Sequence, residues 1–298
     1  MKTFEKAKTF MTERARPLES VLFAYHFENG RTADVLTELS RYQNEDGGFG
    51  RALEPDFRYA GSSVLATSVA LQTLRQLDVS AAEPLVQGAM RYLLKNLDET
   101  RPSWYLISKF PGDVPSAPWW HGYVARVPDG FLANPTAEIT GYLWEYPTLA
   151  PEDVRLRLTE VSLAHLEQAE EMDMFTLPCY LRLFQTPSLL PDVKKQMEVK
   201  LRELLGTAVA PDPAAWEEYV FTPLHAADSP DSPFAGMFDA TIQANLDYLI
   251  QSQADDGSWP PPWSWGDFFA DTWAQVRQEW AGILTLHNLH ALRNFGRL

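Results

Sequence analysis

The densest group of side chains capable of chemistry lies in one short loop, residues 44–61. Its segment Leu-Glu-Pro-Asp-Phe-Arg-Tyr supplies two carboxylates on either side of a proline, then a cation and a phenol: Glu54, Asp56, Arg58 and Tyr59. Because proline restricts the backbone, we expect Glu54 and Asp56 to project toward the same opening. Two carboxyl groups close together beside an apolar wall can share a proton and act as a general acid or an acid–base couple. The alternative is that Arg58 and a helix end simply neutralise them.

A second group is aromatic and lies in the Pro-rich stretch 99–133. It comprises Trp104 and the run Trp119, Trp120 and His121. Two adjacent indoles do not easily face one core, so we expect at least one to line a cavity or its rim. Rings in such a place can stabilise a carbocation by cation–π contact or stack on a sugar. Packing in the core is the alternative for each.

A third group lies in the loop 254–272, which three consecutive prolines stiffen. Its candidates are Trp263 and Trp265 for substrate binding and Asp267 and Asp271 for catalysis. The two aspartates face the same way if this segment is helical. For Asp271 the alternative is capping of the helix that follows.

Other residues argue against a metal or a cofactor. His287 and His290 are three apart, which places both on one helix face, but no third ligand and no His-Glu-x-x-His pattern accompanies them. The single cysteine, Cys179, has apolar neighbours and reads as a packing thiol. The run Gly-Gly-Phe-Gly at 47–50 opens no phosphate loop. We therefore predict no metal site and no cofactor.

Composition restricts the partners. The 298 residues are 45% hydrophobic, and 25 Lys and Arg stand against 40 Asp and Glu, a net charge of −15. Such a charge repels nucleic acid and anionic membranes. No apolar run approaches the ~20 residues of a membrane span, and the first residues lack the apolar stretch of a signal peptide. We expect a cytoplasmic protein with a small-molecule ligand and leave its oligomeric state open.

Helical periodicity runs through the chain, and no convincing strand alternation interrupts it, so the sequence predicts an all-α fold. Three longer connections, 44–61, 99–133 and 254–272, separate the helices. No hinge-like linker occurs, so we expect one domain of helical hairpins, residues 1–298. The expected helices span 3–27 with an interruption at Pro17, 31–43, 62–77, 82–98, 134–146, 152–171, 173–185, 191–205, 213–227, 236–253 and 273–295.

An internal repeat links the two ends of the chain. Residues 67–77 align with 285–295, threonine on threonine and leucine on leucine at an offset of 218. Upstream, the pattern Gln-x-x-x-Gly-x-aromatic occurs at 43–49 and again at 253–259. An acidic residue can hold such a turn, glycine supplies its unusual backbone, and the aromatic ring fits between hairpins. We therefore interpret the motif as a device that joins neighbouring hairpins.

This repeat resembles the Gln-x-x-x-Gly-x-Trp motif of squalene-hopene cyclases, related terpenoid cyclases and protein prenyltransferase β subunits, which are α/α toroids. The stretch 43–74 is similar to the β-subunit segment in which Gly-Gly-Phe-Gly leads into a small-residue-rich inner helix. The resemblance implies a ring of inner and outer helices. Its six inner helices would be 3–27, 62–77, 134–146, 173–185, 213–227 and 273–295.

The resemblance implies an isoprenoid-handling enzyme, cyclase-like or prenyltransferase-like, with an aromatic-lined cavity and a carboxylate general acid. The chain has neither the Asp-x-Asp-Asp nor the Asp-Asp-x-x-Asp motif of terpene cyclases, and Cys179 lacks the neighbouring aspartate of the prenyltransferase zinc site. Two alternatives therefore stay open. One is a carbohydrate-active α/α barrel, hydrolase or lyase, and the other is a non-catalytic ligand-binding toroid.

Overall fold

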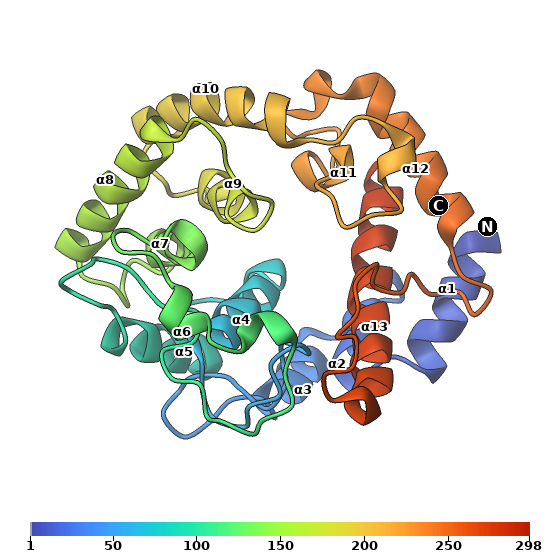
Figure 1. Cartoon of the computed structure of the whole chain (residues 1–298), viewed down its shortest axis with the longest axis horizontal. Coiled ribbons are helices and arrows are strands. Elements are labelled where there is room, and N and C mark those ends of the chain that lie inside the picture. Colours follow the sequence, from blue (N-terminus) through green and yellow to red (C-terminus); the bar gives the residue numbers. More distant parts are fainter. Residues whose placement is uncertain (1) are drawn as a thin grey trace. The chain divides into compact units, whose positions relative to one another are not determined.

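The computed structural model describes residues 2–298, and within them the fold is all-α, as predicted. The described chain holds thirteen α-helices, three short 3-10 helices and a few isolated β-bridges. By its contacts it divides into two compact units (Figure 1). Unit 1 comprises Met1–Leu39 and Val209–Leu298, and unit 2 comprises Ser40–Ala208. The single ring-shaped domain stays a prediction.

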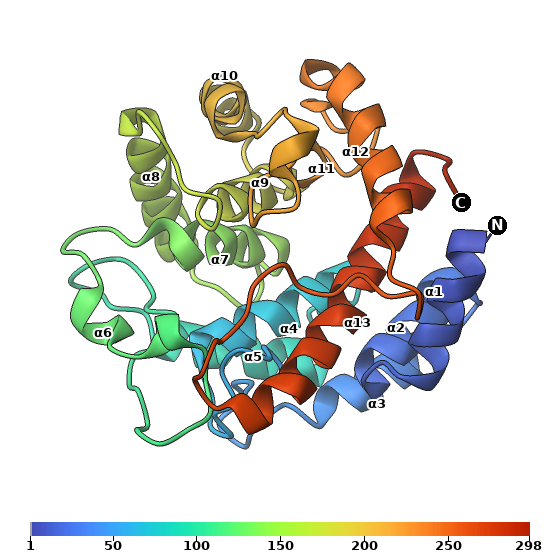
Figure 2. The ribbon, with the colours of Figure 1, turned by 45° about the vertical axis from the view of Figure 1, so that its right-hand side comes forward.

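Unit 1 is organised around one long helix, α13 (Ala270–Asn294). Figure 2 shows α13 beside α1 (Lys2–Glu13) and α2 (Pro17–Phe27), and it also packs against α12 (Asp239–Ser252). Pro17 separates α1 from α2, as expected, because proline is tolerated in the first turn of a helix and not inside one. The remaining elements are α3 (Thr32–Ser40), which crosses the unit boundary, α11 (Pro223–Ala226), η2 (Pro213–Ala215) and η3 (Ala235–Met237).

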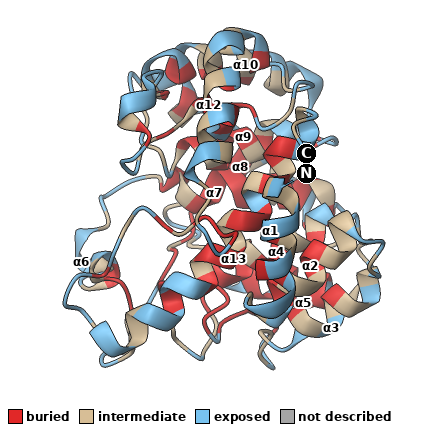
Figure 3. Cartoon of the chain, turned by 90° about the vertical axis from the view of Figure 1, so that its right-hand side faces the viewer, coloured by how far each residue is buried: buried red, intermediate tan, exposed pale blue. Residues whose placement is uncertain are grey.

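Unit 2 is organised around α7 (Ala133–Glu145), which contacts α4, α8 and α9. Every residue of α7 from Pro135 to Trp144 is buried, which is typical of a helix enclosed on all sides (Figure 3). The other elements are α4 (Val64–Gln76), α5 (Pro84–Lys95), η1 (Pro118–Trp120), α6 (Tyr123–Arg126), α8 (Glu152–Gln168), α9 (Leu177–Gln185) and α10 (Pro191–Ala208).

One expected helix is wrong. The segment 213–227 forms only η2 and the single turn of α11, with irregular chain between them. Pro223 lies inside this segment and interrupts the ladder of backbone hydrogen bonds, since it lacks an N–H donor. Among residues 2–298, no helix is both long and apolar enough to cross a bilayer.

The two sequence repeats adopt the same local structure, beginning with the glutamine. Gln43 Nε2 donates to the carbonyl of Gly47 at 2.9 Å and also to a carbonyl in α5, Leu85 O, at 3.1 Å. Gln253 Nε2 repeats both bonds, with Gly257 O at 3.0 Å and Thr3 O of α1 at 2.9 Å. Each glutamine thus ties its own turn to a helix of a neighbouring hairpin.

Glycine is required in each turn for two reasons. Gly47 and Gly257 have φ of 88° and 91°, in the left-handed region that other residues resist. The backbone also approaches a neighbouring helix too closely for a side chain. A Cβ added at Gly257 would lie 2.1 Å from Lys6 O, and one at Gly47 would lie 2.5 Å from Gly88 O.

The aromatic residue of each turn is fixed by a buried threonine. The backbone N–H of Phe49 donates to Thr67 Oγ1 at 3.0 Å, and that of Trp259 donates to Thr285 Oγ1 at 3.1 Å. All four residues are at most 5% exposed. Thr67 and Thr285 are the positions that the sequence repeat aligns. We call this unit, a turn whose aromatic N–H donates to a buried threonine, the clasp.

A third clasp follows α5, where the sequence carries no Gln-x-x-x-Gly pattern. The N–H of Trp104 donates to Thr136 Oγ1 at 3.1 Å, and both residues have no exposed surface. Trp104 Nε1 donates to Leu93 O at 2.7 Å, just as Trp259 Nε1 donates to Leu249 O at 2.8 Å. The turn is one residue longer and lacks glycine, so its relation to the other two is visible only in the structure.

Replacing the clasp threonines with isosteric valine should lower the free energy of unfolding. Thr67→Val, Thr136→Val and Thr285→Val each leave a buried N–H unpaired, which costs about 1–3 kcal/mol. Urea denaturation followed by circular dichroism measures the loss. The matched control is Thr9→Val, an exposed position on α1 whose hydroxyl only bonds Glu5 O, and its effect should stay within about 0.5 kcal/mol. Losses no larger than the control's would contradict the role of the clasp.

Candidate functional site

The carboxylates of the predicted site flank a tight turn in unit 2. The N–H of Phe57 donates to Glu54 O at 3.2 Å, which closes a β-turn with Pro55 at its second position. Proline is favoured there because its ring presets the backbone. Glu54 is 9% exposed and Asp56 is 3% exposed. Two carboxylates that are two positions apart in the sequence thus both belong to buried residues.

A strained segment leads into this turn. Arg51 and Ala52 have φ of 55° and 59°, two consecutive non-glycine residues in the left-handed region. Each costs about 1–2 kcal/mol relative to ordinary backbone. Hydrogen bonds hold them there, since Arg51 N–H donates to Tyr59 O at 2.8 Å and its guanidinium bonds Asn44 Oδ1 at 3.1 Å. These bonds therefore fix the backbone conformation of the loop at Arg51.

Two of the predicted site segments meet in unit 2. The N–H of Ala117 donates to Asp56 O at 2.8 Å, and the N–H of Arg58 donates to Pro115 O at 3.1 Å. These bonds join residues 50–61 to residues 110–123, and we call the combined region the loop junction. It brings the segment of Glu54, Asp56, Arg58 and Tyr59 against the segment of Trp119, Trp120 and His121. The sequence placed these residues in separate loops and did not predict their pairing.

Aromatic rings fill the loop junction. Phe57 is their centre, with ring centroids 5.9 Å from Tyr59, 6.1 Å from Phe110 and 6.2 Å from Trp120. The ring of Phe110 lies 4.9 Å from His121. Contacts at these separations are favourable for aromatic pairs. The backbone that carries two buried carboxylates is therefore surrounded by rings.

The two adjacent indoles take different surroundings. Trp119 is 40% exposed, whereas Trp120 is 8% exposed. Trp120 Nε1 is buried and has no hydrogen-bond partner within residues 2–298. His121 Nε2 lies 3.2 Å from Ser116 Oγ, so a hydroxyl orients the imidazole. The loop junction thus offers an exposed ring, a buried ring with a spare donor, and a positioned histidine.

Trp104 belongs to the fold rather than to this site. We predicted a substrate-binding role, but its ring has no exposed surface, and both its N–H groups donate within the third clasp. The structure shows a residue enclosed by packing, the alternative weighed from the sequence.

The residues predicted in the C-terminal loop lie in unit 1. Trp265 is 1% exposed and its ring lies 5.8 Å from that of Trp273, so it packs in the core. Trp263 is half-buried, 5.1 Å from Trp280. Asp267 and Asp271 are exposed. Asp271 lies in the first turn of α13, where a carboxylate interacts favourably with the helix dipole.

Sequence reasoning missed a buried ionic network that joins α4, α7 and α9. Glu138 is 3% exposed and accepts from Tyr142 Oη at 2.5 Å, from Gln72 Nε2 at 2.8 Å and from Arg182 Nη1 at 3.0 Å. Burial, and then the charge of Glu138, raise the pKa of Tyr142, so the phenol remains a donor. The available signal was a single carboxylate in the otherwise uncharged run Pro135–Trp144. With these three partners, Glu138 connects three helices.

Cys179 and the histidine pair complete the predicted residues. Burial raises the pKa of the Cys179 thiol well above its ordinary value, as suits a packing residue. The His290 ring meets the His26 ring of α2 edge to face at 4.2 Å, and Arg293 Nη2 lies 2.9 Å from His290 Nδ1. Within residues 2–298, no three His, Cys, Asp or Glu side chains are grouped so as to hold a metal ion.

The histidine pair makes the stability of unit 1 sensitive to acid. Burial, followed by the charges of His26, Arg293 and His287, lowers the pKa of His290 to about 3. The folded chain therefore binds this proton less readily than the unfolded chain, whose histidine titrates near 6.5. The stabilisation is complete above pH 6.5 and is lost as the pH falls from 6.5 toward 3, with a slope of up to about 1.4 kcal/mol per pH unit.

Unfolding free energies measured between pH 7 and pH 4 test this dependence. His290→Asn keeps an acceptor for Arg293 but cannot titrate, so we expect a flatter profile than in the wild type. His287→Asn removes an exposed histidine whose charge is the smallest of the causes acting on His290, so its profile should flatten only slightly. Parallel profiles for the wild type and His290→Asn would show that His290 does not carry the effect.

Comparison with known proteins adds no relative. No protein-family model, no curated protein and no solved structure matches the chain. The cyclase and prenyltransferase resemblance therefore rests on the repeat motif. The function has to be inferred from the loop junction and its chemistry.

Proposed function

We propose that the chain is an isoprenoid-handling enzyme, cyclase-like or prenyltransferase-like, that uses a carboxyl group of the loop junction as a general acid. The observation that supports it most is the burial of Glu54 and Asp56, at 9% and 3% exposure, in a turn whose Phe57 lies among aromatic rings. Buried carboxyl groups and ring faces are what the protonation of an alkene requires, because the acid starts the reaction and the rings stabilise the cation.

The proposed step balances without a further reactant. The carboxylic acid of Glu54 donates its proton to a terminal double bond, whose π electrons form the new C–H bond and leave a tertiary cation. Internal double bonds of the substrate attack that cation and close rings. Loss of a proton from the final cation to a carboxylate restores the acid. Arg58 and Tyr59, and the rings of Trp120 and His121, would hold the substrate.

The repeated clasps support an α/α toroid as the scaffold. We infer that the hairpins of both units form one ring-shaped domain over residues 1–298, with a small-molecule ligand and a cytoplasmic location. Three clasps of one geometry, each joining successive hairpins, are what a circular repeat requires. The acidic net charge of −15 disfavours a nucleic acid as the ligand.

A carbohydrate-active enzyme, hydrolase or lyase, is the second candidate, and Trp119 favours it. Trp119 is 40% exposed, so its indole ring can serve as a platform for a sugar ring. In that case Glu54 and Asp56 would act as the carboxylate pair of glycosidic-bond cleavage. The third candidate is a non-catalytic toroid that binds an isoprenoid or a sugar without turnover.

Product analysis with the purified chain distinguishes these candidates. We expect products from farnesyl diphosphate, geranylgeranyl diphosphate or squalene by gas chromatography and mass spectrometry. Glu54→Gln should lower turnover by about 100-fold or more, because it removes the acid. It should leave the free energy of unfolding within about 1 kcal/mol, since glutamine keeps the shape. Glu45→Gln, an exposed carboxylate of the same loop, should leave turnover unchanged.

Other outcomes would replace the proposal. Cleavage of oligosaccharides that Trp119→Ala abolishes would establish the second candidate. Binding of either ligand class without any product would establish the third. A large loss of stability in Glu54→Gln would show that this residue supports the fold and not the reaction.

A further inference from the structure

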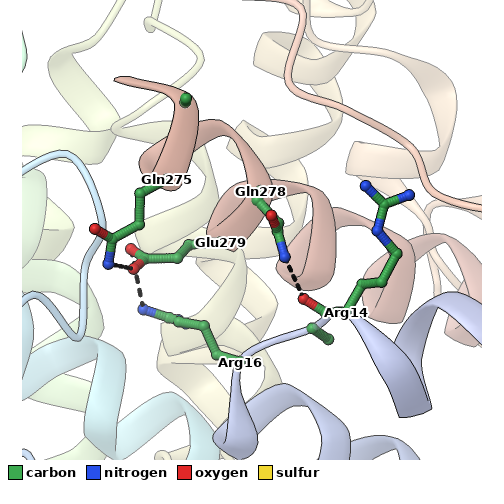
Figure 4. A pocket seen from close by; sticks show the side chains of 7 residues that line it. Arg14, Arg16, Gln275, Gln278 and Glu279 are labelled. Carbon is green, nitrogen blue, oxygen red and sulfur yellow. Dashed lines mark hydrogen bonds and ion pairs between the residues drawn. The ribbon is translucent and has the colours of Figure 1, made fainter. Parts of the chain in front are cut away.

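A surface pocket in unit 1 lies where the connection between α1 and α2 meets α13. Its volume is about 420 Å³, within the range of small-molecule sites. It is lined by Arg14, Ala15, Arg16, Ala274, Gln275, Gln278 and Glu279 (Figure 4). None of these residues belongs to the loop junction.

Buried charges form the base of this pocket. The side chains of Arg16 and Glu279 are both 9% exposed, and that of Glu19 is 4% exposed. Arg16 donates from Nε and Nη2 to the two carboxylate oxygens of Glu19, each at 2.7 Å, and its Nη1 lies 3.9 Å from Glu279 Oε2. Two carboxylates therefore share one guanidinium. The cluster of Arg16, Glu19 and Glu279 therefore carries a net negative charge, and its buried surroundings screen that charge little.

Three side chains of the pocket wall donate hydrogen bonds to other groups of the protein. Gln275 Nε2 donates to Glu279 Oε1 at 2.8 Å, and Gln278 Nε2 donates to Arg14 O at 2.6 Å, as Figure 4 shows. Arg14 Nη1 donates to Asp256 at 2.9 Å. Each amide nitrogen has one of its two N–H groups engaged in this way, and each amide oxygen is available as an acceptor. The wall is thus rich in acceptors: two amide oxygens and a carboxylate.

We propose that this pocket binds a small organic cation through a primary ammonium or guanidinium group. Such a group carries several N–H donors and a positive charge, which match the amide oxygens of Gln275 and Gln278 and the carboxylate of Glu279. An anion is disfavoured at the buried end of the pocket, because the guanidinium of Arg16 already faces the carboxylates of Glu19 and Glu279. The net charge of −15 also attracts a cation to the surface. This site is independent of the function proposed for the loop junction.

Calorimetric titration of the full chain with agmatine, which carries both cationic groups, tests the proposal. We expect saturable binding of agmatine and none of succinate, a dianion of similar length. Glu279→Gln should weaken agmatine binding about 10-fold or more, the usual value of a hydrogen bond to a charged group. Glu203→Gln makes the same charge change at an exposed position on α10 outside the pocket. The affinity of this variant for agmatine should stay within about twofold of the wild type.

A second variant keeps the test decisive if Glu279→Gln fails to fold. Gln278 is exposed, so Gln278→Lys is tolerated by the fold and places an ammonium group in the pocket itself. Binding of agmatine should then be lost while the melting temperature stays close to that of the wild type. Absence of agmatine binding to the wild type, equal affinity in Gln278→Lys, or stronger binding of succinate than of agmatine would each overturn the proposal.

Discussion

A hydrogen bond from an aromatic residue's backbone N–H to a buried threonine hydroxyl recurs at three points in this fold. It joins Phe49 to Thr67, Trp104 to Thr136 and Trp259 to Thr285, at 3.0 to 3.1 Å. Each bond fixes where an irregular turn meets the helix that follows it. Because donor and acceptor are both fully or almost fully buried, neither can turn to water instead. The arrangement of successive hairpins depends on this contact.

The candidate site depends on two of these clasps. The chain leaves Phe49 directly into residues 50–61, and it leaves Trp104 toward residues 110–123. These are the two halves of the loop junction. Their backbones then pair at Asp56 and Ala117, which brings the turn of the buried carboxylates to the ring cluster around Phe57. The strain at Arg51 and Ala52 persists because both ends of the loop are held.

The sequence predicted the all-α fold from helical periodicity and two of the clasps from an internal repeat. The alignment of residues 67–77 with 285–295 matches the two threonines that accept the aromatic N–H groups. It missed the third clasp, because Trp104 follows a longer turn without glycine. It also missed the network of Glu138, Gln72 and Arg182, whose members come from three helices far apart in the chain. The helix expected at 213–227 failed because a proline outweighed periodicity. Pairing between loops leaves no local pattern, so the loop junction was beyond sequence reasoning.

Hydrogen exchange of individual backbone amides, followed by NMR, tests the central claim most directly. If the clasps hold the hairpins together, the amides of Phe49, Trp104 and Trp259 should exchange only through opening with a free energy near that of global unfolding, although they lie outside helices. Exchange of these three amides as fast as that of the exposed loop glycines Gly112 and Gly130 would contradict the account.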